Sequence, residues 1–142
     1  MRSTLVDTGP LVALFDKADA WHLTVTEFLA GHPSSLMTSW PVLTEVHYML
    51  KHHMWLDVLE WIEQGGVQVA DVPAQSFRRL SALSRKYRDL PMDFADATLV
   101  LLAELHDQPE IITIDSDFDV YRFGPNRPFR NLLGDRRSIS PR

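Results

Sequence analysis

Four acidic side chains stand at widely separated positions of the 142-residue chain: Asp7, Glu45, Asp96 and Asp115. Carboxylates drawn from distant parts of a chain suit hard divalent cations such as Mg²⁺ and Mn²⁺, which prefer oxygen ligands. A cation held in this way lowers the pKa of a bound water, which can then attack a phosphoryl group. The four residues predict a metal-dependent phosphoryl-transfer site, provided that the fold brings them together.

Two of the acids follow segments with the character of a β-strand. Asp7 ends the first predicted strand, and Asp115 follows the last one. In an open parallel sheet, ligands bind outside the carboxyl ends of the strands. An acid at such a place can equally form a turn or cap a helix. Position at a strand end therefore leaves the functional and the structural interpretations open for both residues.

The other two acids lie on predicted helices, where residues three or four positions away share a face. The neighbours of Glu45 on that face are Pro41, Val42, Tyr48 and Met49, and those of Asp96 are Met92, Asp93, Leu99 and Val100. Neither set contains Lys or Arg, and an ionised carboxylate on an apolar face is costly unless something pairs with it. A metal ion is the missing partner that we predict. Helix capping accounts better for Asp93, at the start of its helix.

The elements that must position these acids alternate along the chain. Strands are predicted over residues 3–7, 35–38, 67–72 and 110–114, and helices over 11–15, 20–30, 40–50, 54–62, 74–87 and 93–105. Ser39 is predicted to cap the helix that carries Glu45. Apolar strands that alternate with helices are typical of an α/β fold with a parallel sheet covered on both faces.

Size and composition indicate one folded domain. The chain is 45% hydrophobic and 23% charged, and it has no cysteine, which fits a reducing compartment. The first seven residues do not form a secretory signal. The longest strongly apolar run, residues 97–103, is far shorter than the ~20 residues that cross a bilayer. We therefore expect a cytoplasmic protein that does not enter a membrane.

The charge distribution bears on whether the partner is a nucleic acid. A net charge of −5 argues against binding to phosphates, but residues 120–142 contain six arginines and one acid. This arginine- and proline-rich end is predicted to be a loosely held extension. If the partner is RNA, its phosphates would contact this end or a basic residue such as Lys51. The alternative is an ordinary acidic protein with a solvated basic tail.

Four short strings add specificity to these arguments. They are Val6-Asp-Thr-Gly-Pro-Leu11, Thr44-Glu45, Met92-Asp-Phe-Ala-Asp-Ala97 and Thr113-Ile-Asp-Ser-Asp-Phe118. In this order and at these separations they resemble the PIN-domain proteins, in particular the VapC-type toxins of bacterial and archaeal toxin–antitoxin pairs. The resemblance covers roughly residues 3–123.

The resemblance implies a three-layer α/β/α fold with a mostly parallel central sheet over residues 1–123, followed by a C-terminal extension, 124–142. It also implies an Mg²⁺- or Mn²⁺-dependent endoribonuclease, with an RNA substrate, a small antitoxin partner and a homodimeric state. The implied catalytic acids are Asp7, Glu45, Asp96 and Asp115, of which Asp7, Asp96 and Asp115 hold the metal. The implied supporting residues are Thr8, Asp93, Thr113 and Asp117.

One departure from the family pattern concerns the fourth acid. The spacing in Asp115-Ser-Asp117-Phe118 is one residue tighter than the commonest pattern, so that Asp117 is able to share or take over the role of Asp115.

Other interpretations remain open from the sequence. A PIN-like fold that binds RNA or protein without cutting is one alternative, and a metal-dependent phosphatase or DNA nuclease is another. Three histidines near Glu45 lack the i, i+4 pair of a zinc helix, so we expect them at the surface or at helix ends: His47, His52 and His53. The four tryptophans are predicted to pack in the core or a dimer contact and not to stack on bases: Trp21, Trp40, Trp55 and Trp61.

Overall fold

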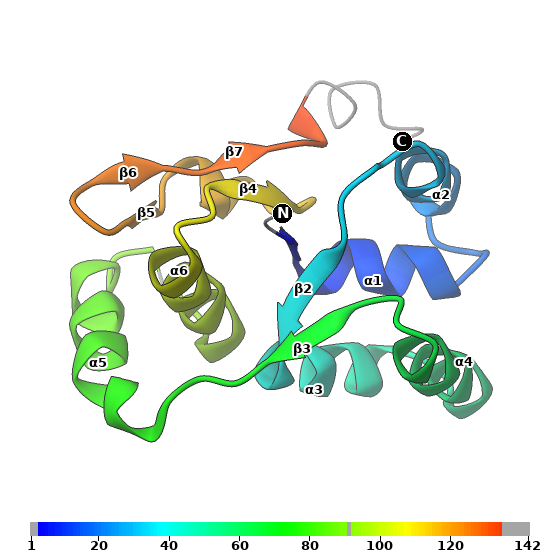
Figure 1. Cartoon of the computed structure of the whole chain (residues 1–142), viewed down its shortest axis with the longest axis horizontal. Coiled ribbons are helices and arrows are strands. Elements are labelled where there is room, and N and C mark those ends of the chain that lie inside the picture. Colours follow the sequence, from blue (N-terminus) through cyan, green and yellow to red (C-terminus); the bar gives the residue numbers. More distant parts are fainter. Residues whose placement is uncertain (1–2, 91, 135–142) are drawn as a thin grey trace.

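A five-stranded parallel sheet forms the centre of the protein (Figure 1). The computed structural model describes residues 3–90 and 92–134. The strand order is β3-β2-β1-β4-β7, and every neighbouring pair is parallel. The strands are β1 (Thr4–Val6), β2 (Leu36–Ser39), β3 (Gln68–Ala70), β4 (Glu110–Ile112) and β7 (Arg130–Asn131).

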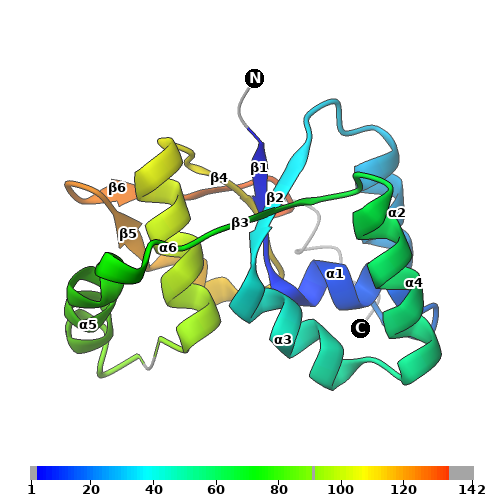
Figure 2. The same ribbon diagram turned by 60° about the horizontal axis from the view of Figure 1, so that its bottom comes forward.

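Helices cover both faces of this sheet. They are α1 (Thr8–Phe15), α2 (His22–Ala30), α3 (Trp40–Met49), α4 (His52–Glu63), α5 (Phe77–Lys86) and α6 (Phe94–His106). In Figure 2, α5 and α6 lie on one side of the strands and α1, α2 and α4 on the other. The remaining elements are the 3-10 turns η1 (Ala74–Ser76) and η2 (Ser116–Asp119), and an antiparallel pair, β5 (Arg122–Phe123) with β6 (Arg127–Pro128). The three-layer α/β/α prediction is confirmed.

Helix α6 is a core element along most of its length. All nine residues from Ala95 to Ala103 are buried, which is expected of a helix that is apolar on every face. Its Thr98 hydroxyl lies 2.7 Å from the Ser39 hydroxyl, so that a buried polar contact joins α6 to the junction of β2 and α3. The helix that carries Asp96 is therefore held firmly against the sheet.

A charged contact holds the outer side of α6. Arg79 of α5 donates two hydrogen bonds to the carboxylate of Glu104 on α6, at 2.9 and 2.5 Å. The second of those carboxylate oxygens also accepts the backbone N–H of Gly124 at 2.7 Å. Bidentate pairing of this kind fixes geometry as well as adding attraction. It links α5, α6 and the turn between β5 and β6.

Most predicted elements are confirmed to within a few residues, and the caps follow the predicted chemistry. The Ser39 side chain accepts the backbone N–H of Val42, and Asp93 accepts that of Asp96. The predicted helix over 74–87 begins with a 3-10 turn, η1, before α5. No described helix is long and apolar enough to cross a membrane.

The expectation of a loosely held end after Phe123 is wrong for the described part of that segment. Strand β7 pairs with β4, and Leu133 behind it is fully buried. Apolar side chains between the arginines, Phe129 and Leu132 among them, pack against the core and hold the segment in place. Three of the tail arginines, Arg136, Arg137 and Arg142, lie outside the described residues.

Candidate active site

The pairing of β1 with β4 places Asp7 at the carboxyl edge of the sheet. Val6 is in register with Ile112, and the backbone N–H of Asp7 donates to the Ile112 carbonyl at 3.0 Å. Asp7 and Thr113 consequently leave the two strands side by side. Because β1 is the middle strand of five, Asp7 lies at the centre of this edge. Asp7 is only 5% exposed.

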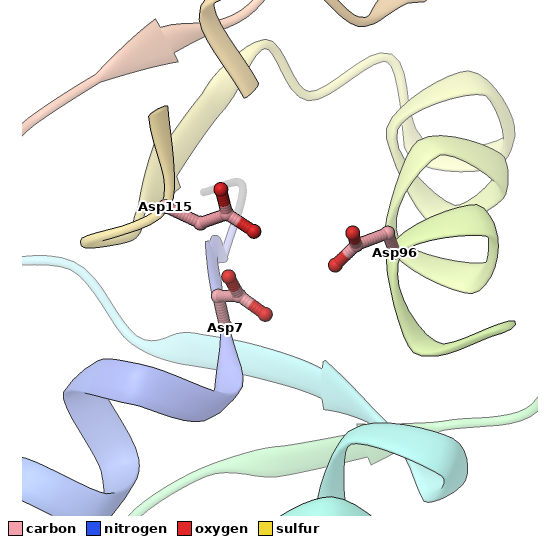
Figure 3. A group of neighbouring side chains, drawn as sticks. All are labelled: Asp7, Asp96 and Asp115. Atoms are coloured by element: carbon pink, nitrogen blue, oxygen red, sulfur yellow. The ribbon is translucent and has the colours of Figure 1, made fainter. Parts of the chain in front are cut away.

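Three aspartates meet at this edge, as Figure 3 shows. Asp7 follows β1, Asp115 lies beyond β4, and Asp96 projects towards them from the first turn of α6. One carboxylate oxygen from each lies within 4.8 Å of the other two. These are the three residues that the sequence analysis assigned to a metal. Their carboxylates form the oxygen-rich donor set that a hard divalent cation prefers.

Hydroxyl groups orient the Asp7 carboxylate. The Thr113 hydroxyl donates to Asp7 Oδ2 at 2.8 Å and accepts the backbone N–H of Asp115 at 2.9 Å. The other oxygen, Asp7 Oδ1, accepts the backbone N–H of Thr8 at 2.8 Å. Thr113 therefore couples two of the three aspartates, in agreement with the supporting position that the sequence analysis gave it.

Glu45 lies beside the three aspartates and outside the group of oxygens that approach one another. Its Oε1 accepts the Thr8 hydroxyl at 2.6 Å, which joins α3 to the residue after Asp7. The predicted apolar neighbours of Glu45 differ in burial. Val42 is fully buried, whereas Tyr48 is 90% exposed and Met49 is 59% exposed, and Glu45 itself is half-buried. The apolar surround of Glu45 is therefore partial, at the edge of the core.

The structure separates Asp115 from Asp117. Asp115 belongs to the aspartate group, and its Oδ1 accepts the backbone N–H of Asp117 at 2.9 Å as the cap of η2. Asp117 has no oxygen in that group. The tight spacing thus makes Asp117 part of the turn that Asp115 caps.

Burial, and to a lesser extent repulsion between carboxylates, raises the pKa values of three acids at this site, Asp7, Glu45 and Asp96. Burial, more than the neighbouring carboxylates, raises the pKa of Asp7 to about 6. Burial and then the charges of Asp7, Asp93 and Asp115 raise the pKa of Asp96 to about 8. Burial also raises the pKa of Glu45. Among the described residues, no Lys or Arg forms a salt bridge with any of the four acids, so a cation would relieve this repulsion.

Tyr121 contacts the site and was missed from the sequence. Its phenol is fully buried and donates to Asp96 Oδ2 at 3.2 Å. The ring packs edge-on against Phe118 and Tyr87. Burial raises the pKa of the phenol, so it stays a donor. A sequence signal existed, since Phe118 and Tyr121 are three residues apart in the turn that follows the fourth acid.

The other candidate ligands lie away from the aspartates. His47, His52 and His53 are exposed on α3 and α4, which confirms the expectation for them. The described arginines of the C-terminal segment make internal contacts. Arg127 pairs with Asp107, Arg130 pairs with Glu110, and Arg122 donates to three backbone carbonyls of its own turn.

The raised pKa values predict how stability varies with pH. The unfolded chain ionises its aspartates near pH 3.8, whereas folded Asp7 and Asp96 keep their protons to about 6 and about 8. Metal-free protein should therefore lose thermal stability as the pH rises from about 4 to 8. Millimolar Mg²⁺ or Mn²⁺ should restore it at pH 8. Thermal melts at pH 5, 6.5 and 8 check this, with Asp96→Asn expected to flatten the fall above pH 6. Melting curves at pH 8 that ignore the metal would contradict it.

A second prediction concerns the buried phenol. Tyr121→Phe removes the donor to Asp96 and keeps the ring, so Mn²⁺ affinity measured by calorimetry should fall roughly 10-fold, the equivalent of a ~1.5 kcal/mol hydrogen bond to a charged group. Tyr87→Phe is the matched control. The Tyr87 hydroxyl accepts the backbone N–H of Arg122 at 2.8 Å and makes no hydrogen bond to the aspartates of the site. Equal Mn²⁺ affinities for the two variants would show that the Tyr121 hydroxyl has a structural role only.

Comparison with known proteins agrees with this geometry. The chain is 29% identical over 115 residues to Ribonuclease VapC26 of Mycobacterium tuberculosis, over 78% of this chain and 85% of that protein. The crystal structure of M. tuberculosis VapC20, a Sarcin-Ricin loop cleaving toxin, superposes with a TM-score of 0.76 at 25% identity, over 89% of this chain and 100% of that one. VapBC2 from Rickettsia felis, solved with a promoter DNA fragment, shares the fold, with a TM-score of 0.64 at 18% identity over 92% of this chain and 98% of that one. A family model described as PIN domain matches residues 4–124, a span that includes all three converging aspartates, and the chain therefore belongs to the PIN-domain family.

Proposed function

We propose that this protein is an Mg²⁺- or Mn²⁺-dependent endoribonuclease and the toxin of a toxin–antitoxin pair. The observation that carries the proposal is the convergence of the Asp7, Asp96 and Asp115 carboxylates with no cationic side chain paired to them among the described residues. The names of VapC26 and VapC20, a ribonuclease and an RNA-cleaving toxin, support the same activity. Roles for individual residues are part of the proposal.

Each acid has a distinct place in the proposed reaction. Asp7, Asp96 and Asp115 would hold the metal, which supplies an activated water and neutralises charge on the phosphate. Thr113 holds one Asp7 oxygen and the Asp115 backbone N–H, and Tyr121 holds one oxygen of Asp96. These contacts orient the carboxylates before the RNA arrives.

Glu45 is proposed to accept the proton that the attacking water loses. It is half-buried, it is held by the Thr8 hydroxyl, and burial raises its pKa towards neutrality, where a general base works best. Asp93 and Asp117 are proposed to support the site through hydrogen bonds to the backbone. The Asp93 carboxylate accepts the backbone N–H of Asp96, and the backbone N–H of Asp117 donates to the Asp115 carboxylate.

The decisive experiment measures turnover with Mn²⁺ on three kinds of substrate. These are an RNA hairpin containing a sarcin–ricin loop together with unstructured RNA, single- and double-stranded DNA, and a small phosphate ester. Asp96→Asn should reduce RNA cleavage by more than about 100-fold, the upper range for losing a residue that only supports a metal ligand. Asp57→Asn, an exposed acid on α4, is the matched control and should leave cleavage unchanged.

Other outcomes would assign a different function. Turnover only on DNA or on the small ester would indicate the DNA nuclease or the phosphatase. Metal binding without turnover on any substrate, together with Asp96→Asn raising the melting temperature, would indicate a binding module. We expect RNA cleavage because VapC20, at 25% identity over the whole of its own length, is described as cleaving RNA.

The partners and the setting follow from the same proposal. A toxin of this kind acts in the cytoplasm, forms a homodimer and is inhibited by a small antitoxin that reaches the acidic pocket. Co-expression with whichever short reading frame adjoins the gene for this protein, followed by size measurement of the purified complex, tests both the antitoxin and the dimer.

A further inference from the structure

An open cavity of about 340 Å³ lies next to the aspartates, between the N-terminal ends of α3 and α6. Its wall is largely apolar with one acid, and its lining residues are Trp40, Pro41, Thr44, Glu45, Phe94 and Ala95. Both helices begin at this cavity, since Trp40 is the first residue of α3 and Phe94 the first of α6.

Two aromatic side chains at this cavity are exposed to solvent. Trp40 is 63% exposed and Phe94 is 56% exposed, and they are not the most exposed aromatic residues, since Tyr48 and Phe77 are more so. The other tryptophans differ from Trp40, because Trp21 is buried and Trp55 and Trp61 pack against the core. Core packing is therefore wrong for Trp40, and its exposure does not test the dimer contact. What distinguishes Trp40 and Phe94 is their place beside the acidic site, where uncovered aromatic surface can form part of a ligand-binding groove.

The cavity adjoins the acidic site through Glu45 and Ala95. Glu45 is on its wall, and the Thr8 hydroxyl bonded to Glu45 belongs to the residue directly after Asp7. On the α6 side, the lining residue Ala95 directly precedes Asp96. A nucleotide whose phosphate lies at the three aspartates therefore has this cavity next to it.

The chemistry of the wall fits an unpaired nucleobase. Bases of single-stranded RNA stack on exposed aromatic side chains, and each such contact is substantial. The Thr44 hydroxyl donates to the Trp40 carbonyl at 3.2 Å, so its hydrogen is already used, and Glu45 is the charged acceptor on this wall. A carboxylate accepts hydrogen bonds from an exocyclic amino group, which cytosine, adenine and guanine carry and uracil lacks.

We propose that the cavity between α3 and α6 binds one unpaired, amino-bearing base of the RNA, beside the phosphate held at the aspartates. Trp40 and Phe94 supply the stacking surface and Glu45 accepts from the amino group. The inference rests on the proposed ribonuclease function. It adds a requirement on the RNA substrate, which must have an unpaired base next to the phosphate that is cleaved.

Two neighbouring cavities share part of this wall. One has a volume of about 570 Å³ and is lined by Thr44, Glu45, Tyr48 and Met49, all on α3, so that it has the carboxylate but no residue of α6. The other has a volume of about 430 Å³ and shares Trp40 and Thr44, but its other lining residues are Leu43, His47, Trp55, Leu59, Ile62 and Val69, without a carboxylate. Among these three, only the first cavity described combines Glu45 with two exposed aromatic side chains and the start of α6, the helix that carries Asp96.

The test pairs protein variants with abasic RNA. The substrate is an oligonucleotide that the wild-type protein cleaves, prepared as a series in which each nucleotide near the cut is made abasic in turn. Trp40→Ala and Phe94→Ala should each raise KM roughly 10-fold on intact RNA with kcat changed less than about 2-fold, since one stacking contact is lost. At one position of the series, the abasic RNA should bind the wild-type protein and the Trp40→Ala variant with equal affinity. Removal of that base and removal of the Trp40 ring abolish the same contact, so the second change has no further effect.

Phe77→Ala is the matched control, because Phe77 is 66% exposed and lies on α5, outside the lining of this cavity. It should leave KM unchanged. The proposal is overturned if Trp40→Ala weakens intact and abasic RNA equally at every position. It is also overturned if the variant changes only self-association or capture of the antitoxin, which would make the patch a protein contact. Wild-type protein that cleaves no RNA would overturn the proposed function and this inference together, whereas cleavage that ignores Trp40 and Phe94 overturns this inference alone.

Discussion

Electrostatic repulsion among buried carboxylates is the constraint around which this molecule is arranged. Asp7 and Asp96 are each 5% exposed, and both approach Asp115 with no compensating cationic side chain among the described residues. Left to itself such a group would spread apart or take up protons, and the pKa values of Asp7 and Asp96 are raised by burial first and by the neighbouring carboxylates second. The surrounding fold must hold the three acids close at a cost in stability, which is the usual relation between a functional site and its scaffold.

The scaffold resists this repulsion with elements that cannot easily move. Asp7 is attached to the central strand, which pairs on both sides, and Asp96 to a helix that is buried over most of its length. The Ser39–Thr98 contact and the Arg79–Glu104 pair hold that helix from two directions. Hydrogen bonds to single carboxylate oxygens, from Thr113 and Tyr121, set the orientation of the acids. Positions and orientations are thus fixed by different interactions.

The sequence was sufficient for the fold class, most elements, and the three aspartates that converge. These follow from local signals, namely apolar periodicity, caps at Ser39 and Asp93, and acids at the ends of strands. Properties that depend on long-range packing were beyond it. Tyr121 reaches Asp96 only because the turn after β4 folds back onto α6, and Trp40 is exposed because no element within residues 3–90 and 92–134 covers it. The strand β7 was missed because it consists of two polar residues, Arg130 and Asn131, and the apolar residues that anchor it, Phe129 and Leu132, flank it without a strand pattern.

The hydrogen bond from Thr113 to Asp7 joins residues 106 positions apart, and it has a consequence for biosynthesis. Contacts between distant residues form late, because the loop-closure entropy has to be paid first. A chain emerging from the ribosome presents Asp7 at the outset, but it lacks Asp115 and β4, one of the two strands that pair with β1, until most of the polypeptide has been made. The group of three aspartates therefore cannot assemble on the nascent chain before that point. For an enzyme that acts on RNA, this delay means that the ribosome, which is itself made of RNA, is not exposed to the assembled site while most of the chain is being made.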